Sequence, residues 1–237
     1  MKVDGKYVIV PAAGAGLRFG GRTKKQFSLL GGTEILARTL LALSSCEELN
    51  GILVVTAAED VPTVLALTEK HRISKILSVI PGASTRQGSV LCGLRSLPKD
   101  CRLVAVHDGV RPFVTPALLS ASFAAAEEYG ACVAAVPVTD TVKRSADGFV
   151  RDTPPRAELF AAQTPQTFQK DLLLQAYLAA EAAGDLTLTD DAQAVERYGS
   201  TPVRLIPGSP ENLKITSPAD LLLAESLLER KAGREKH

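Results

Sequence analysis

The stretch Tyr7-Val-Ile-Val-Pro-Ala-Ala-Gly-Ala-Gly-Leu-Arg18 decides the fold, because it joins a short apolar run to a turn of small residues. Tyr7 to Val10 is typical of a buried strand. The turn follows this strand directly, so we expect it where a parallel sheet presents its carboxyl edge, the usual ligand crevice of an α/β fold. Gly14 and Gly16 allow positive φ angles and a close approach of the backbone to a ligand.

The same turn carries the first chemical signal. Successive backbone N–H groups there can hold phosphate oxygens, and the nearby cations add positive charge. These cations are Arg18, Arg22, Lys24 and Lys25. The spacing lacks the GxxxxGK[ST] pattern of a Walker loop and the third glycine of GxGxxG, which disfavours a dinucleotide-binding dehydrogenase. On glycine spacing alone, a tight connection with solvated basic residues is an equal alternative.

Strands and helices alternate along the first half of the chain. Apolar runs predict strands at 7–10, 52–56, 76–80, 103–106 and 131–136. Helical patterns predict helices capped by Thr33 (to about residue 44), opened by Asp60 (to about 71), spanning 87–97, and capped by Thr115 (to about 129). This order predicts an α/β fold with a Rossmann-like, mostly parallel twisted sheet and helices on both faces. An aliphatic composition without Trp suits such a buried sheet.

The alternation stops after Pro137. Two polar segments, 139–145 and 149–153, flank a turn signal at Ala146-Asp147-Gly148 and predict a protruding β-hairpin. A two-stranded ribbon this polar is not stable alone in water, so we expect it to contact another subunit. Further patterns predict helices at 170–183 and 190–198, a strand at 203–206, and a last helix from 217 to about 230 before a frayed end. We expect a single domain, 1–237, with an arm at about 138–158.

The overall composition excludes several classes of partner. The formal net charge is +1, which gives no long-range field for nucleic acid or an anionic membrane. No apolar run reaches membrane-spanning length, and the first ten residues are unlike a signal peptide. The four cysteines lack CxxC spacing, which indicates reduced thiols and a cytoplasmic protein. Any anion site must therefore be local.

Several separated segments, in the right order, resemble one family. PAAGAGLRFG followed by KKQF resembles the signature of nucleotidyltransferases that join a sugar or polyol phosphate to a nucleotide. His107-Asp-Gly-Val-Arg-Pro112 resembles the HDxxRP signature of the 2-C-methyl-D-erythritol 4-phosphate cytidylyltransferases, which ribitol-5-phosphate cytidylyltransferases share. Ala162-Gln-Thr-Pro-Gln166 and Asn212-Leu-Lys-Ile-Thr216 are similar to further family segments. The resemblance runs from Val8 to the last helix and implies the nucleotide-diphospho-sugar transferase type of fold.

The resemblance implies a CTP site made by two loops. In the first loop, Arg18 and Lys25 would bind the triphosphate and stabilise charge as pyrophosphate leaves, which needs positioned cations and no nucleophile. In the second, a backbone carbonyl and N–H at fixed spacing could select cytosine. Arg86 either orders this second loop or binds a partner. The CTP-binding residues implied are Pro11, Ala12, Ala13, Gly14, Ala15, Gly16, Arg18, Lys25, Ala83, Ser84, Arg86 and Ser89.

The resemblance also implies an acceptor site for a polyol phosphate. Asp108 would lie near both substrate and a divalent cation such as Mg²⁺, held mostly through the CTP phosphates. Arg156 would reach the active site of the neighbouring subunit in a homodimer formed by arm exchange, where its planar fork can grip a phosphate. The catalytic residues implied are Arg18, Lys25, Arg156 and Lys214, and the acceptor-binding residues are Asp108, Arg111, Thr141, Arg156, Thr164, Thr189 and Lys214.

Plainer interpretations remain beside these. Thr189 is a natural helix N-cap, and His107, beside an apolar strand, is more often a structural hydrogen-bonder than a base. The resemblance implies transfer of CMP from CTP to 2-C-methyl-D-erythritol 4-phosphate in non-mevalonate isoprenoid biosynthesis. Ribitol 5-phosphate is the alternative acceptor, although the Pro11-Ala-Ala-Gly14 loop favours the erythritol enzymes. A non-catalytic nucleotide-binding module is the alternative from another class.

Overall fold

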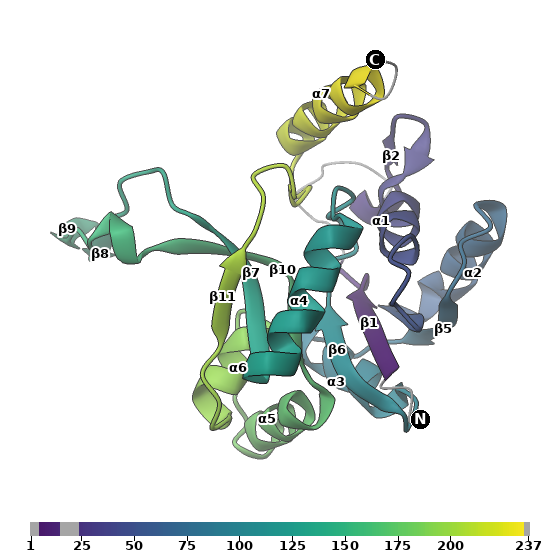
Figure 1. Cartoon of the computed structure of the whole chain (residues 1–237). Helices are drawn as coiled ribbons and strands as arrows, with labels where there is room; N and C mark the ends of the chain where they lie inside the picture. Colours follow the sequence, from purple (N-terminus) through teal and green to yellow (C-terminus); the bar gives the residue numbers. More distant parts are fainter. Residues whose placement is uncertain (1–4, 15–23, 235–237) are drawn as a thin grey trace.

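The computed structural model describes residues 5–14 and 24–234, and its centre is a seven-stranded sheet with the order β11-β7-β10-β6-β1-β4-β5 (Figure 1). All neighbouring pairs are parallel except the two that β10 makes with β6 and β7. The prediction of a mostly parallel sheet is therefore confirmed. The strands of this sheet are β1 (Gly5–Pro11), β4 (Gly51–Thr56), β5 (Ile76–Pro81), β6 (Cys101–Val106), β7 (Ala131–Pro137), β10 (Phe160–Gln169) and β11 (Arg204–Pro207).

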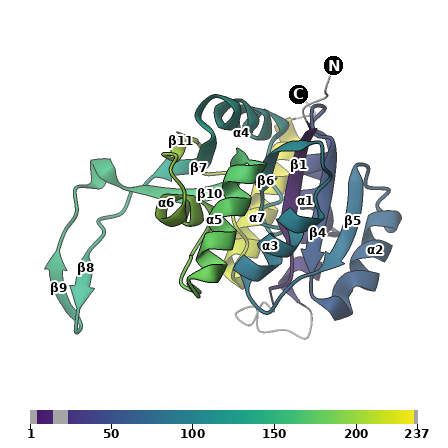
Figure 2. The same cartoon turned by 90° about the horizontal axis from the view of Figure 1, so that it is seen from below.

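Helices cover both faces of the sheet, as the alternating pattern predicted (Figure 2). Side chains alternate along each strand. Val8 and Val10 of β1 pack with α1, α2 and α4, whereas Tyr7 and Ile9 pack with α3, α5 and α6. The helices are α1 (Ile35–Ser44), α2 (Val61–Lys70), α3 (Arg86–Ser96), α4 (Pro116–Tyr129), α5 (Lys170–Ala182), α6 (Asp191–Tyr198) and α7 (Pro218–Arg234).

Among the described residues, three short elements lie between Gly14 and α1, and one of them, β2, contacts the C-terminal helix. They are the 3-10 turn η2 (Lys25–Phe27) and the strands β2 (Leu29–Leu30) and β3 (Thr33–Glu34). Leu30 packs in a small third cluster with Ile215 and Ala224, which places α7 beside β2 (Figure 1). The predicted cap by Thr33 is wrong, because Thr33 belongs to β3 and the N-cap position of α1 is Glu34. The last helix, predicted to end at about residue 230, extends to Arg234.

The predicted hairpin is present as a ribbon of β8 (Arg144–Ala146) and β9 (Phe149–Asp152), which extends away from the sheet in both views (Figures 1 and 2). Asp147 and Gly148 form its two-residue turn, with φ angles of 53° and 83°. Two successive positive φ angles are what a tight hairpin turn requires, and Asp-Gly supplies them readily. A further 3-10 turn, η4 (Arg156–Glu158), joins the ribbon to β10.

The largest departure from the predicted order is β10, an antiparallel strand inserted between β6 and β7. Its middle residues, Gln163 to Gln166, are polar and include a proline, so no apolar alternation announces the strand. The register of β10 on β7 shifts between Ala162 and Gln166. Such an irregularity re-aims side chains, and here it turns the polar residues toward the edge that carries the predicted site.

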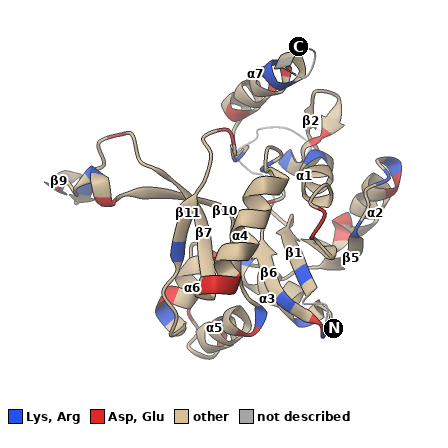
Figure 3. Ribbon diagram, viewed as in Figure 1, with Lys and Arg blue, Asp and Glu red and all other residues tan. Residues whose placement is uncertain are grey.

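The remaining composition predictions concern charge and thiols. In Figure 3, among the residues drawn in colour, Lys and Arg alternate with Asp and Glu over the outer helices and form no continuous basic face in that view. All four cysteines are free, and three of them are buried while Cys92 is half-buried. Within residues 5–14 and 24–234, no helix combines the length and the apolar character needed to cross a bilayer.

Candidate active site

A cavity of about 360 Å³ opens at the carboxyl edge of the sheet, beyond the ends of β1, β5 and β6. This volume lies in the range of small-molecule sites. Every predicted CTP-binding residue that the structure describes lines this cavity, hereafter the donor cavity. Its lining is Pro11, Ala12, Ala13, Gly14, Lys25, Gln26, Ala83, Ser84, Thr85, Arg86, Ser89, Asp108, Gly109, Val110 and Lys214.

The start of the glycine-rich turn is fixed by hydrogen bonds to its backbone. The Ala12 N–H donates to the Val55 carbonyl at 2.7 Å, and the Ala12 carbonyl accepts from the Gln26 side-chain amide at 3.0 Å. Gln26 is buried and lies in η2 beside Lys25. This bond therefore ties the segment that carries Lys25 to the turn. Gln26 belongs to the KKQF segment of the sequence, but no role was predicted for it.

Lys24 was predicted to add positive charge around the glycine-rich turn, but its side chain pairs with acidic residues elsewhere. Its ammonium group pairs with Asp60 at 2.7 Å and Glu59 at 3.0 Å. The hydrogen bond to Asp60 is the main reason that the pKa of Lys24 is raised. Its charge is therefore directed to the start of α2, and of these two neighbouring lysines it is Lys25 that lines the donor cavity.

The second loop of the donor cavity is organised by two hydroxyl groups. The Ala83 N–H donates to Ser89 Oγ at 3.1 Å, and Thr85 Oγ1 caps α3 by accepting from the Gly88 N–H at 3.0 Å. A Cβ on Gly82 would lie 2.5 Å from Ser89 Oγ, so only glycine lets the chain pass this close to Ser89. The backbone groups of this loop are thereby held at fixed spacing, as selective recognition of a base requires.

A second cavity of about 250 Å³ adjoins the first and holds most of the predicted acceptor residues. Arg86, Asp108 and Lys214 line both cavities, so they mark the boundary between them. We call the second one the acceptor cavity. It is lined by Arg86, Asp108, Arg111, Ala162, Gln163, Thr164, Gln166, Thr189, Asp190 and Lys214.

Asp108 is the acidic group at this boundary. Its carboxylate pairs with Lys214 Nζ at 3.0 Å and with Arg111 Nε at 3.3 Å. Burial by itself would raise the pKa of Asp108, but Lys214, Arg86 and Arg111 together hold it well below its usual value. Asp108 therefore stays ionised, and its charge is balanced by cations that phosphate groups could also attract.

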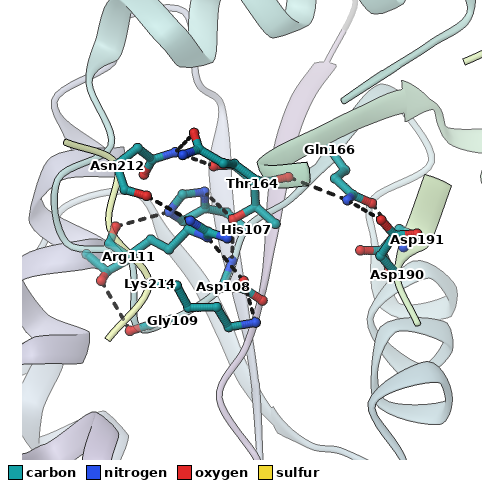
Figure 4. Close-up of polar contacts among 12 residues, drawn as sticks. His107, Asp108, Gly109, Arg111, Thr164, Gln166, Asp190, Asp191, Asn212 and Lys214 are labelled. Carbon is teal, nitrogen blue, oxygen red and sulfur yellow. Dashed lines mark hydrogen bonds and ion pairs between the residues drawn. The ribbon is translucent and has the colours of Figure 1, made fainter. Parts of the chain in front are cut away.

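A buried hydrogen-bond network supports Asp108 from behind (Figure 4). The Asp108 N–H donates to Thr164 Oγ1, which donates to His107 Nδ1, both at 3.1 Å. On the other side, His107 Nε2 donates to the Arg111 carbonyl at 3.2 Å. Arg111 Nη1 in turn donates to the Asn212 carbonyl at 2.7 Å. His107 is thus a structural hydrogen-bonder with both ring nitrogens engaged, as its position beside an apolar strand predicted.

Two predicted site residues, Thr141 and Arg156, lie outside both cavities. Both are exposed on the arm that carries β8 and β9. Arg156 Nη1 donates to the Thr139 carbonyl at 3.0 Å, which holds the side chain at the root of the arm. Within one chain, therefore, the structure does not bring these two residues to Asp108 and Lys214. Ala15, Gly16 and Arg18 lie outside the described residues.

Thr189 lines the acceptor cavity, but the prediction that it caps a helix is wrong. The N-cap of α6 is Asp190, which accepts from the Gln193 N–H at 2.9 Å. Thr189 instead donates from its backbone N–H to the Gln193 side chain at 2.8 Å. The two residues are adjacent and both are good caps, so spacing in the sequence could not separate them.

The donor set at the boundary fits a divalent cation that is carried by phosphates. The described residues contain no group of three or more His, Cys, Asp or Glu side chains that could hold a metal. Asp108 could supply one carboxylate oxygen. Mg²⁺ commonly binds through one or two carboxylates, water and substrate phosphate oxygens, so a single acidic residue here suffices.

These parts define a class of protein. A cavity at the carboxyl edge of the sheet, lined by the start of a glycine-rich turn and by a second ordered loop, and an adjoining polar cavity that shares its cations are what a nucleotidyltransferase needs. Comparison with known proteins gives the family. Residues 6–230 match the family model for 2-C-methyl-D-erythritol 4-phosphate cytidylyltransferase, and the chain belongs to that family.

Individual relatives agree with this assignment. A curated protein of that name from Symbiobacterium thermophilum is 45% identical, over 95% of this chain and 93% of its own. One from Geobacter metallireducens is 42% identical, over 95% of this chain and 98% of its own. The crystal structure of 4-diphosphocytidyl-2C-methyl-D-erythritol synthase from Anaerococcus prevotii is similar with a TM-score of 0.84 at 31% identity, covering 96% of this chain and 99% of that one. The predicted type of fold and the enzyme class are thereby confirmed.

Proposed function

We propose that this enzyme transfers CMP from CTP to 2-C-methyl-D-erythritol 4-phosphate, giving 4-diphosphocytidyl-2-C-methyl-D-erythritol and pyrophosphate in non-mevalonate isoprenoid biosynthesis. The observation that carries the proposal is the pair of adjoining cavities with Arg86, Asp108 and Lys214 at their boundary. A nucleotide in the first and a polyol phosphate in the second would bring two anionic groups together where fixed cations can neutralise them.

The reaction needs positioning and charge stabilisation rather than a protein nucleophile. A phosphate oxygen of the acceptor attacks the α-phosphorus of CTP in line, and the bond from that phosphorus to the bridging β-phosphate oxygen breaks as pyrophosphate leaves. Lys25 and Arg18 bind the triphosphate and stabilise the leaving charge. Lys214 orients the acceptor phosphate and balances charge on the attacking side, while Asp108 accepts hydrogen bonds from the polyol.

The proposal includes a divalent cation, a second subunit and a cellular location. Mg²⁺ bound to the phosphates would neutralise triphosphate charge, and Asp108 would supply it with a carboxylate oxygen. Thr141 and Arg156 would complete the acceptor site of a neighbouring subunit in a homodimer, which their distance from the cavities of their own chain supports. The four free cysteines favour a reducing compartment, the cytoplasm.

The acceptor is tested by comparing two polyol phosphates. Purified enzyme with CTP should release pyrophosphate rapidly with 2-C-methyl-D-erythritol 4-phosphate and much more slowly with ribitol 5-phosphate. Turnover of ribitol 5-phosphate alone would overturn the proposed acceptor. Membership of the erythritol family favours the first outcome.

Catalysis itself is tested at Lys25. Lys25→Ala should lower the rate by about two to three orders of magnitude, as removal of one charge-stabilising group from an active site does, while the fold survives. Lys99→Ala is a matched control, because Lys99 is exposed just before β6, at the opposite edge of the sheet. Near-normal turnover in Lys25→Ala would remove this lysine from the mechanism and favour a different arrangement of the triphosphate.

A further inference from the structure

A buried carboxylate that lines neither cavity accepts two hydrogen bonds from Arg86, which lies at the boundary between the cavities. Asp191, in the first turn of α6, has no exposed surface. Its Oδ2 accepts from Arg86 Nη2 at 2.6 Å, and its Oδ1 accepts from Arg86 Nη1 at 3.0 Å and from the Tyr177 hydroxyl at 2.5 Å. Tyr177, on α5, is also buried. The Asp191 carboxylate thus accepts three hydrogen bonds, and two of them come from Arg86.

The backbone of Asp191 is fixed as firmly as its side chain. Gln166 Oε1 accepts from the N–H groups of Asp191 and Ala192 at 3.0 and 2.8 Å, and Gln166 Nε2 donates to Asp190 Oδ2 at 2.9 Å (Figure 4). Gln166 lies on β10, so the first turn of α6 is tied to the central sheet. The carboxylate of Asp191 therefore occupies one place, and the two-point grip fixes the plane of the Arg86 guanidinium with it.

Arg86 itself reaches both cavities. It is the first residue of α3, directly after the loop of Ala83 to Thr85 in the donor cavity, and it also lines the acceptor cavity. Its side chain is 34% exposed, so part of the guanidinium faces the cavities while the rest faces Asp191. An arginine presents five donors in a rigid fork, and two are used on Asp191, which leaves others for phosphate oxygens.

We propose that Tyr177 and Asp191 are positioning residues, which act through Arg86 to hold its guanidinium where the phosphates of donor and acceptor meet. This inference rests on the proposed function and extends it to residues that contact neither substrate. An unrestrained arginine would lose side-chain order and could fold back onto Asp108, whereas a held one meets the phosphates already oriented. A buried ion pair is weak grounds for a stability role, because its desolvation cost offsets most of its attraction.

The chain contains a second Tyr–Asp–Arg trio that serves as a matched control. Asp185 accepts from Arg197 Nη1 at 3.0 Å and from the Tyr198 hydroxyl at 3.0 Å. This trio lines neither the donor nor the acceptor cavity. Tyr177→Phe and Tyr198→Phe each remove one hydroxyl from such a trio. Melting temperatures of both variants report any difference in stability, since Tyr198 is less buried than Tyr177.

The experiment measures kcat/KM for pyrophosphate release from CTP and 2-C-methyl-D-erythritol 4-phosphate in two backgrounds. Tyr177→Phe should lower kcat/KM about tenfold, the size of one hydrogen bond to a charged group, and Tyr198→Phe less than about twofold. In an Arg86→Lys background, where no planar fork is left to orient, Tyr177→Phe should change kcat/KM less than about twofold. A purely structural role would instead reduce the folded, active fraction by the same factor in both backgrounds.

Two results would overturn the positioning role: a Tyr177→Phe effect no larger than that of Tyr198→Phe, or an equal effect with Arg86 and with Lys at position 86. Either result leaves the proposed function standing if the unaltered enzyme turns over. The proposed function fails on a different observation, the absence of turnover by the unaltered enzyme. Asp191→Asn is a harsher variant, because it removes the buried counter-charge of the half-buried Arg86, and it is read only if it melts cooperatively.

Discussion

His107 gives a prediction of pH-dependent stability that can be worked through in numbers. Burial lowers the pKa of His107 to about 4, although the hydrogen bond to the Arg111 carbonyl and the charge of Asp108 act in the opposite direction. Its Nε2 donates to that carbonyl and its Nδ1 accepts from Thr164, which is the pattern of a neutral imidazole. In the unfolded chain the same side chain has a pKa of about 6.5.

Between those two pKa values a proton binds only to the unfolded chain. The free energy of unfolding therefore falls as the pH decreases from about 6.5 to about 4, and the contribution is fully present above pH ~6.5. Full passage through this window costs about 3 kcal/mol for this one side chain. From pH ~7.5 to pH ~5 the free energy of unfolding decreases by about 2 kcal/mol, because this interval includes ~1.5 of the ~2.5 pH units between the two pKa values.

The measurement is urea unfolding followed by far-UV circular dichroism, because the chain has no tryptophan. The His107→Gln variant can still donate to the Arg111 carbonyl and serves as the reference. The other groups titrate equally in the unaltered protein and in the variant. The difference between the two proteins in the pH dependence of the free energy of unfolding therefore isolates the contribution of His107. We expect the variant to be less stable at pH ~7.5 but to lose about 2 kcal/mol less than the unaltered protein by pH ~5. Parallel pH dependences in the two proteins would refute the reasoning.

Three further predictions test the packing, the metal and the arm. Gly93→Ala should destabilise the protein by about 1–3 kcal/mol in the same urea assay, because its Cβ would lie 2.9 Å from Ile9 Cγ2 and force α3 away from β1; an unchanged midpoint would contradict this close packing. Chelation of divalent cations should abolish pyrophosphate release and added Mg²⁺ should restore it, since a cation bound to the CTP phosphates would neutralise the charge that develops as pyrophosphate leaves; continued turnover in chelator would rule out a metal requirement. Deletion of residues 139–153 should convert a dimer into a monomer in sedimentation, because the exposed Phe149 and Val150 of the arm need a surface to cover them; a stable monomer for both the intact and the shortened chain would exclude arm exchange.

The fold could be predicted from the sequence wherever one physical rule determined the local structure. The apolar runs that became β1, β4, β6 and β7 are buried on both faces, so hydrophobicity alone marks them. The Asp-Gly turn and the Thr115 cap depend on local backbone chemistry and were predicted at the correct residues. In contrast, β10 could not be recognised, because its polar centre and its proline suggest a loop, and its place in the sheet depends on pairing with strands 23 or more residues earlier in the sequence, the separation of Phe160 from Pro137.

In the candidate site, too, the features with a local sequence signal could be predicted, and those that depend on long-range contacts could not. Most cavity-lining residues were found because they stand in recognisable segments, but the sequence presents segments such as HDGVRP, AQTPQ and NLKIT as separate motifs. The structure makes them one unit: β10 places Thr164 beside His107, and the segment before α7 brings the Asn212 carbonyl to Arg111. Long-range partners of this kind carry no local signal. Arg86 and Asp191 are 105 residues apart, and neither the composition nor the spacing of their surroundings links them. A sequence therefore indicates which side chains can meet a phosphate, whereas the residues that hold those side chains in place become visible only once β10 and α6 are packed together.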